Sequence, residues 1–302
     1  MLAEAGIAAA ALAALPALRE ALRTPAHRLR DGTNAGFAAL PQGVTRLDWR
    51  GPPDGPVTVC IHGLTTPSFV WEPLAPLLAL TGARVLSYDL WGRGLSDRAP
   101  GRQDADYFCG QLAALLADQG VQGPVRLIGY SMGGAIATAF AARHRDRIAA
   151  LTLLAPAGMG HDLGPLAATA ARLPVLGDWA FHLAYPASHR RMARAQPAPF
   201  ALPDLPARLE RQLARRGYVG SVLSSLRGIL ARPQETEHRA IARAGIPVMA
   251  LWGDRDAVIP PSCRDRLRLW NPGARHAVIH GADHGLPYTH ADAVFATLAL
   301  SD

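Results

Sequence analysis

The sequence contains no lysine and only three cysteines, and both scarcities narrow the range of functions. All 31 basic residues are arginines, and with 24 acidic residues they give a formal net charge of +7. The arginines are scattered along the chain, which indicates a compositional bias instead of a nucleic-acid-binding face. The cysteines lie far apart, so we predict neither a disulfide framework nor a zinc site.

A long apolar segment is also missing. The N-terminal apolar run covers only residues 5–14, and Glu4 precedes it where a signal peptide would have a basic region. Such a run is a poor signal peptide and is too short to cross a bilayer. Leu15, Leu18 and Leu22 are spaced three and four apart, which predicts an amphipathic helix that packs on the body or rests on a membrane surface. We expect a cytoplasmic protein, with membrane contact through this helix as a second hypothesis.

The chain as a whole has the composition of a globular protein with a large core. Of its 302 residues, 49% are hydrophobic, and short apolar runs alternate with longer helical patterns. We predict buried strands at 57–61, 84–88, 125–128, 151–154, 248–252 and 276–279, and helices at 71–80, 104–119, 132–143 and 291–300. Strands that alternate with helices predict an α/β fold with a mainly parallel sheet.

The alternation of strands and helices is interrupted once. From Gly158 to about Thr236 the chain carries many prolines and Ala/Arg-rich helical pieces but no convincing strand. We therefore predict a helical cap inserted between two strands of one sheet. The expected domains are an N-terminal helix and leader segment (1–43), a core (44–157 and 237–302) and the cap (158–236).

A serine stands where the chain passes from a predicted strand to a predicted helix. The segment Gly129-Tyr130-Ser131-Met132-Gly133 follows the strand at 125–128 and opens the helix at 132–143. This is the context of a Gly-x-Ser-x-Gly nucleophile elbow, a strained turn that points the serine hydroxyl outward at the head of the sheet. A serine that merely caps the helix would explain the helix start but not two glycines placed symmetrically around it.

A nucleophilic serine needs a base, and the base needs an acid that orients it. His284 lies in a loop just past the last predicted strand, and Asp254 and Asp256 follow the strand before it. The order serine, aspartate, histidine is the order expected for this kind of elbow. All of these groups are predicted at the carboxyl ends of parallel strands, where open α/β sheets place their sites.

These motifs resemble the α/β-hydrolase family, in particular its serine esterases and monoacylglycerol lipases, over residues 44–300. The resemblance implies that the acid is Asp256, the second aspartate of a Gly-x-x-Asp pattern, with Asp254 as the other candidate. The sequence departs from many family members at Thr289, where they carry a glutamate five residues beyond the histidine. The turn from Asp89 to Ser96 is similar to a family motif with a structural role.

The resemblance also implies an oxyanion hole made of backbone N–H groups. His62-Gly63 matches the family's motif after strand three, so Leu64 would donate one N–H and Met132 the other. The residues expected to support the elbow and this loop are His62, Gly63, Gly129, Tyr130 and Gly133.

We predict no metal and no cofactor. His276, His280 and His284 are spaced by four, which on a helix would form a metal-binding face. The segment between the first two has the pattern of a strand, so their side chains would not converge.

The function expected from these residues is hydrolysis of a carboxylic ester with an apolar acyl or alcohol part, through an acyl-enzyme on Ser131. Serine at the elbow argues against dehalogenases and epoxide hydrolases, which require a carboxylate nucleophile. The cap is rich in Ala, Leu and Pro, which favours an apolar lid. The candidate pocket residues are Trp179, Phe181, Tyr185 and Phe200.

Two other functions stay open at this point. A carbon–carbon bond hydrolase of a ring-cleavage diketone acid would use the same triad, with Arg190, Arg191 and Arg194 as partners for the substrate carboxylate. A ligand-binding member of the fold would need no catalysis. The expected partner in either enzymatic case is a small molecule, and the sequence does not determine an oligomeric state.

Overall fold

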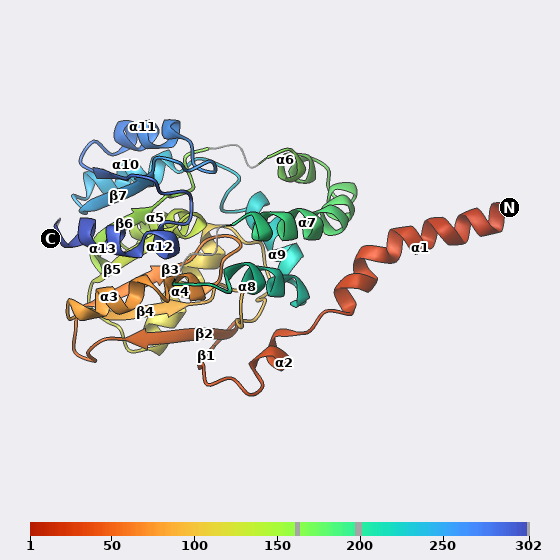
Figure 1. The fold of residues 1–302 in the computed structure, drawn as a ribbon, viewed down its shortest axis with the longest axis horizontal. Helices are drawn as coiled ribbons and strands as arrows, with labels where there is room; N and C mark the ends of the chain where they lie inside the picture. The colour runs from red at the N-terminus through yellow and green to blue at the C-terminus, as the bar shows by residue number, and fades with distance from the viewer. Residues whose placement is uncertain (161–163, 197–200, 301–302) are drawn as a thin grey trace.

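The structure is a computed structural model that describes residues 1–160, 164–196 and 201–300, and its centre is an eight-stranded sheet (Figure 1). The strand order is β1-β2-β4-β3-β5-β6-β7-β8. Strands β3 to β8 are parallel, which confirms the predicted α/β fold class. The strands are β1 (Gly36–Leu40), β2 (Gly43–Arg50), β3 (Val57–Ile61), β4 (Arg84–Tyr88), β5 (Val125–Tyr130), β6 (Ile148–Leu154), β7 (Val248–Gly253) and β8 (Arg275–Ile279).

Helices cover both faces of the sheet, so the central strands are apolar on both sides. Helices α3 (Leu74–Leu80) and α13 (Ala291–Ala299) pack together on one face. On the other face α4 (Ala105–Asp118) and α10 (Glu235–Arg243) pack against α5 (Met132–Arg143), and α11 (Pro261–Trp270) packs against α10. The main core lies between these layers.

The first two strands form an antiparallel hairpin that the sequence analysis did not predict. β1 pairs with β2 from Gly36 opposite Leu47 to Leu40 opposite Gly43. In β2 the buried Thr45 and Leu47 alternate with charged residues, so the strand has a period of two but no continuous apolar run. The sheet therefore begins within the segment that we assigned to the leader.

Helix boundaries differ from the predicted ones where proline or a capping side chain intervenes. The helix expected at 71–80 divides into a 3₁₀ turn (Ser68–Trp71) and α3, which begins directly after Pro73. α4 begins after Asp104, whose carboxylate accepts a hydrogen bond from the Tyr107 N–H at 3.2 Å. α5 has the predicted bounds.

Between β6 and β7 the described residues form helices, with no strand of the sheet among them. They are α6 (Pro165–Arg172), α7 (Leu176–Ala195), α8 (Leu205–Arg211), α9 (Tyr218–Arg227) and the start of α10, with further 3₁₀ turns at Gln212–Ala214 and, before β6, at Arg145–Arg147. α7, α8 and α9 lie beyond one end of the sheet (Figure 1). Phe181, Tyr218 and Leu223 belong to a second hydrophobic cluster, separate from the main core.

The N-terminal helix α1 (Leu2–Ala21) extends away from the body, and the short helix α2 (Ala26–Arg30) connects it to the sheet (Figure 1). Within the described ranges, no helix is both long and apolar enough to cross a bilayer. The last short helix, α12 (Leu286–Thr289), follows β8 and precedes α13.

Candidate active site

Ser131 stands in a strained turn between β5 and α5. Its φ of 54° and ψ of −119° lie in a region that non-glycine residues rarely adopt. Backbone hydrogen bonds hold it there: its N–H donates to the Leu154 carbonyl at 3.0 Å, and its carbonyl accepts from the N–H groups of Gly134 and Ala157 at 2.9 Å. The surrounding structure therefore stabilises a conformation that the residue alone would avoid.

The glycines around Ser131 are required by close backbone approach. A β-carbon on Gly129 would lie 2.4 Å from the Gly133 carbonyl oxygen. A β-carbon on Gly133 would lie 2.0 Å from the Ile61 carbonyl oxygen at the end of β3. Because real β-carbons do not approach oxygen so closely, no side chain fits at either position without moving the backbone.

The structure brings Ser131, His284 and Asp256 together, although they lie far apart in the sequence. Nε2 of His284 is 3.0 Å from the Ser131 hydroxyl oxygen, and Nδ1 is 2.9 Å from Oδ2 of Asp256. The Asp256 side chain is almost fully buried, whereas 19% of the His284 side chain is exposed. The three groups form the geometry of a nucleophile, a base and an orienting acid.

The Asp256 carboxylate is held in its charged form. Burial opposes its ionisation, but the hydrogen bond from His284 and the N–H groups of Val258 and Ile259 outweigh burial and keep the pKa of this carboxyl below its usual value. The other candidate acid, Asp254, points elsewhere: it contacts His280 at 3.2 Å and accepts from the Gly281 N–H at 2.7 Å. The geometry thus favours Asp256 over Asp254 as the partner of His284.

The loop after β3 lies against the serine. A β-carbon on Gly63 would be 3.3 Å from the Ser131 β-carbon, so the two backbones nearly touch. Among the described residues, the N–H groups of Leu64 and Met132 donate to no protein acceptor. Two such amides beside a nucleophile are suited to binding a developing negative charge on oxygen.

His62 and Tyr130 are buried residues that contact the loop after β3 and the His284 ring. His62 is fully buried; its Nδ1 donates to the Gly63 carbonyl, and its Nε2 accepts from the Leu90 N–H, both at 2.8 Å. Burial lowers the pKa of His62 to about 4, although nearby Asp89 opposes the shift. The ring is therefore neutral at physiological pH. The Tyr130 ring lies 5.3 Å from the His284 ring and is buried.

Two residues that the sequence analysis did not single out for a site role hold the loops in place. Thr289 occupies the position where many family members have glutamate, and its hydroxyl lies 2.9 Å from the Gly285 carbonyl and 3.2 Å from Asp283. Arg93 is fully buried, and its Nε donates to the Leu64 carbonyl at 3.1 Å. Its position in the turn after β4 was visible in the sequence, but its contacts depend on the fold.

The four candidate pocket residues have different environments. Phe181 is buried and stacks on Tyr185 with ring centroids 4.7 Å apart, in the second hydrophobic cluster, against which Leu64 also packs. Trp179 instead donates its indole N–H to the Leu12 carbonyl of α1 at 3.0 Å. Phe200 lies outside the described residues.

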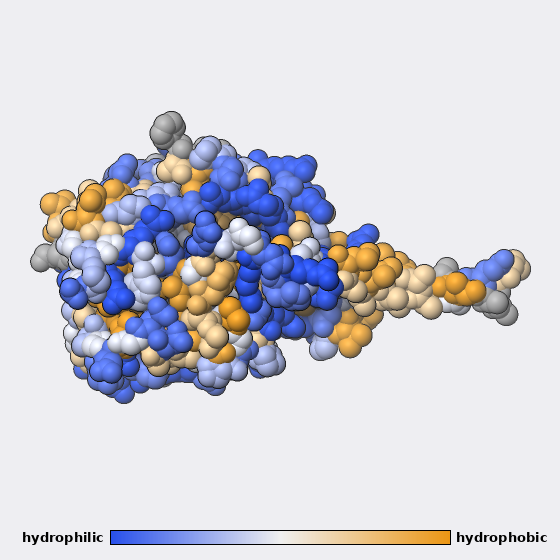
Figure 2. Space-filling model, turned by 90° about the horizontal axis from the view of Figure 1, so that it is seen from below, coloured by the Kyte–Doolittle hydropathy of each residue, from blue (hydrophilic) through white to orange (hydrophobic). Residues whose placement is uncertain are grey.

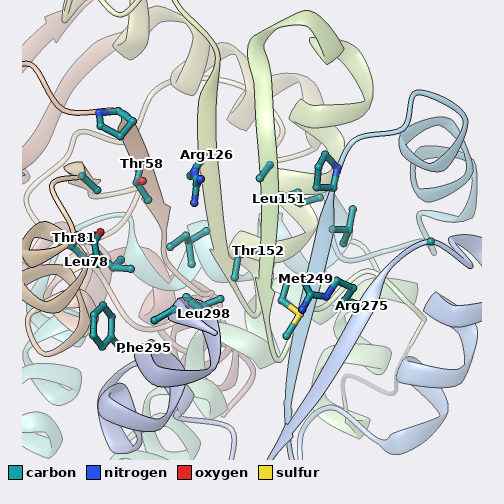
Figure 3. A pocket seen from close by; sticks show the side chains of 18 residues that line it. Thr58, Leu78, Thr81, Arg126, Leu151, Thr152, Met249, Arg275, Phe295 and Leu298 are labelled. Carbon is teal, nitrogen blue, oxygen red and sulfur yellow. Dashed lines mark hydrogen bonds between the residues drawn. The ribbon is translucent and has the colours of Figure 1, made fainter. Parts of the chain in front are cut away.

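A cavity of about 360 Å³ lies against the sheet, lined by residues near the starts of several strands (Figure 3). Ser131 instead follows the last residue of β5. The lining of the cavity includes Thr58 and Arg126, near the starts of β3 and β5, and Phe295 and Leu298 of α13. Ile128 of β5 also lines the cavity, so only the last residues of that strand separate the lining from Ser131. Ser131 therefore lies beyond the lining of this cavity.

Comparison with known proteins agrees with this geometry. Residues 56–291 match the family model described as the alpha/beta hydrolase fold. The chain is 29% identical to a pimeloyl-[acyl-carrier protein] methyl ester esterase of Neisseria meningitidis over 79% of this chain and 90% of that protein. It is 27% identical to a bifunctional esterase/perhydrolase of Acinetobacter calcoaceticus over 86% and 96% of the two chains.

Solved structures share the same fold. The enol-lactonase of Burkholderia xenovorans superposes with a TM-score of 0.71 at 24% identity, covering 88% of this chain and all of that one. The chain therefore belongs to the α/β-hydrolase fold family. Within that family it is an esterase/lipase-type hydrolase.

Proposed function

We propose that this protein hydrolyses carboxylic esters through an acyl-enzyme on Ser131. The observation that carries the proposal is the continuous hydrogen-bonded series from Asp256 through His284 to Ser131, with links of 2.9 and 3.0 Å. This series supplies both nucleophile activation and proton transfer, which a hydroxyl attacking an ester requires at neutral pH.

In the first half of the reaction, Ser131 Oγ attacks the ester carbonyl while His284 Nε2 takes the hydroxyl proton. The Leu64 and Met132 amides donate to the oxyanion of the tetrahedral intermediate, each worth about 3 kcal/mol in related sites. Asp256 stabilises the imidazolium because its own pKa is held low. The proton then passes from His284 to the departing alcohol oxygen, and the acyl-enzyme remains.

In the second half, His284 takes a proton from water, and the hydroxide oxygen attacks the acyl carbonyl. Collapse of the second tetrahedral intermediate returns the proton to Ser131 and releases the carboxylic acid. The same two amides serve both steps because the oxyanion forms at the same place each time.

The substrate class is an ester with an apolar acyl or alcohol part. The second hydrophobic cluster adjoins Leu64, and the Tyr218 hydroxyl lies 3.4 Å from the Thr65 carbonyl, so apolar and aromatic groups of the helical segment border the oxyanion loop. We accordingly propose that residues 158–236 act as a cap. The two relatives described above are named esterases, which supports an ester substrate.

No specific observation favours the carbon–carbon bond hydrolase. It would need cap arginines at the substrate carboxylate, but Arg190 and Arg191 are exposed on α7. Arg194 is also exposed and pairs with Glu210 at 2.8 Å. A dienoic ring-cleavage acid should therefore not be turned over under conditions where short and medium p-nitrophenyl esters are.

The decisive experiment combines ester turnover with covalent labelling by a fluorophosphonate. The wild-type protein should react with the probe and hydrolyse p-nitrophenyl esters, whereas Ser131→Ala should lose labelling and fall by more than about 10³-fold in kcat. Ser262→Ala, which changes an exposed serine on α11, is the matched control and should behave as wild type. Undiminished turnover by Ser131→Ala would overturn the proposal, and a wild type that neither labels nor turns over would favour a ligand-binding protein.

A further inference from the structure

The N-terminal half of α1 points away from the rest of the molecule (Figure 1). Three large apolar side chains on this helix are largely exposed: Ile7 at 71%, Leu12 at 53% and Leu18 at 58%. Leu22, directly after the helix, is 78% exposed. The space-filling view shows the resulting arm as a mostly apolar surface where it leaves the body (Figure 2).

An exposed apolar helix of this kind requires a covering surface. Helices in water are stabilised mainly by burying one face, and a contiguous exposed apolar patch marks an interaction site. The C-terminal half of α1, here called its root, is attached to the body of the protein. Trp179 donates to the Leu12 carbonyl at 3.0 Å, and Arg216 donates to the carbonyls of Ala21 and Arg23. The apolar side chains of α1, and Leu22 after it, that these contacts leave exposed are what a partner would cover.

The charges at the root of α1 indicate what the partner is. Arg19, Arg28 and Arg216 are exposed there. Arg98 lines a nearby cavity of about 660 Å³ together with the acidic residues Glu20 and Asp178. Glu20 is engaged by Arg23 and by the Gly217 N–H, and Asp178 pairs with Arg227. The group of Arg19, Arg28, Arg98 and Arg216, here called the arginine collar, therefore keeps its positive charge. An apolar arm that ends in a basic collar matches the apolar interior and the anionic headgroups of a lipid bilayer.

We propose that α1 docks this protein on an anionic lipid bilayer, with its apolar side chains at the acyl boundary and the arginine collar at the headgroup phosphates. A second copy of the chain fits less well. Parallel pairing of two arms would bring their arginine collars together, and like charges repel.

The test uses the full-length protein in co-sedimentation with vesicles. Binding should be stronger to mixed phosphatidylglycerol–phosphatidylcholine vesicles than to phosphatidylcholine alone, and added salt should weaken it. The double variant Ile7→Glu/Leu18→Glu should bind at least about tenfold more weakly, because it places charges at the acyl boundary. The matched control Leu80→Glu/Leu269→Glu makes the same change at apolar residues of the body that are 81% and 67% exposed, and it should bind as wild type.

Two results would overturn the docking proposal. One is equal vesicle binding by both double variants. The other is absence of vesicle binding by the wild type. If the wild type is then a dimer that Ile7→Glu/Leu18→Glu converts to a monomer in sedimentation velocity, the arm is assigned to a second copy. Turnover of a soluble ester should be unchanged in every variant and reports that the body is folded.

A separate observation concerns the loop after β3. Thr66 is 6% exposed, and its hydroxyl is buried with no hydrogen-bond partner among the described residues. A β-carbon on Gly63 would lie 3.2 Å from this hydroxyl oxygen and 3.3 Å from the Ser131 β-carbon. The Thr66 hydroxyl and the Ser131 side chain therefore both lie against Gly63, the residue before Leu64.

Resting on the proposed function, we infer that the Thr66 hydroxyl is a third donor to the oxyanion. A buried hydroxyl without a partner is unfavourable in the resting enzyme, and an oxyanion formed beside it would accept its hydrogen bond. Because that bond exists only when negative charge develops, it lowers the barrier and raises kcat without tightening substrate binding.

Thr66→Val keeps the shape and removes the hydroxyl, so kcat should fall by roughly 10- to 100-fold with little change in KM. Thr66→Ser should restore most of the rate, and Thr65→Val, at the half-buried neighbour, should leave it unchanged. Wild-type kcat in Thr66→Val, or equal loss in Thr66→Ser, would overturn the inference. Fluorophosphonate labelling of Thr66→Val separates failure of this inference from failure of the proposed function, since labelling reports whether His284 still activates Ser131.

Discussion

The carboxyl edge of the sheet and the helical segment between β6 and β7 are held in different ways. At the sheet edge, backbone meets backbone: α5 approaches β3 so closely that Gly133 has no room for a β-carbon. The helical segment packs on the core through apolar residues such as Leu205 and Leu209, and two buried arginines add hydrogen bonds between the two regions. Arg93 donates to Ser225 at 2.8 Å and to Leu64, and Arg215 donates to the Gly94 carbonyl at 2.9 Å.

The difference shows which part of the site is rigid. Backbone contacts leave no freedom to the groups that they position, which suits a nucleophile whose placement must be accurate to a fraction of an ångström. A guanidinium on a long side chain tolerates small displacements of what it binds, which would suit the proposed cap. Burial lowers the pKa of both Arg93 and Arg215 to about 10, so each remains charged at neutral pH.

The largest expected effect is the loss of kcat when Asp256, the proposed acid at the rigid sheet edge, is substituted. Asp256→Asn should lower kcat by about 10³- to 10⁴-fold, because a neutral amide cannot stabilise the imidazolium or fix its tautomer. Asp254→Asn, which only loses contacts to exposed His280 and to Gly281, should change kcat by less than about fivefold. Steady-state kinetics on a p-nitrophenyl ester checks both. Equal losses in the two variants would contradict the assignment of the acid.

The next effect tests the backbone contact itself. Gly133→Ala should destabilise the fold by about 3 kcal/mol or more, since the new β-carbon would lie against the Ile61 carbonyl oxygen. Gly110→Ala is the matched control, because nothing lies within 4 Å of a β-carbon on this exposed α4 residue. That change should stabilise the protein by about 0.5–1 kcal/mol. Urea unfolding measures the stability of both variants. Similar unfolding midpoints would show that the close contact at Gly133 does not determine stability.

A smaller effect is expected at the junction of the two regions. Arg93→Met should lower the free energy of unfolding by about 2–4 kcal/mol, because it leaves the Leu64 carbonyl and the Gln103 and Ser225 side chains without their buried partner. Arg102→Met, at an exposed position, should cost less than about 0.5 kcal/mol. Thermal and urea unfolding decide between these outcomes, and a stable Arg93→Met would mean that packing alone holds the helical segment.

The smallest effect concerns pH and His238 of α10. This residue is buried, neither ring nitrogen has a partner among the described residues, and burial lowers its pKa from 6.5 to about 4. The folded state keeps the ring neutral while the unfolded chain takes up a proton below pH 6.5. Stability from this group is therefore complete above that pH and is lost as the pH falls towards 4.

His238→Phe removes this titration. The stability of the variant relative to wild type should increase by about 1–3 kcal/mol between neutral pH and about pH 4.5, as measured by urea unfolding at both values. The acid sensitivity due to His62 should remain in both proteins. A constant difference between the proteins across this range would show that His238 does not carry the effect.

Much of the fold was predictable because its signals are local. The strands at 57–61 and 84–88 and the helix at 132–143 have the predicted bounds, since each is a short apolar run or a helical period ended by a clear boundary residue. β2 was missed because charged residues alternate with its buried ones, and β1 was missed because its five residues form only a short and partly exposed apolar run. Arg93 could be placed in a turn, but its contacts with Ser221 and Ser225 form only after α9 has packed over that turn.

The amino-acid sequence by itself determined the alternation of strands and helices along the chain from β3 onward and the strained turn at Ser131. Both depend on residues within a few positions of one another. Tertiary structure alone decided that Asp256 and not Asp254 faces His284, that Thr289 braces the histidine loop, and that α1 extends from the body. Those outcomes depend on contacts between distant segments. Their geometry exists only once the layers have packed.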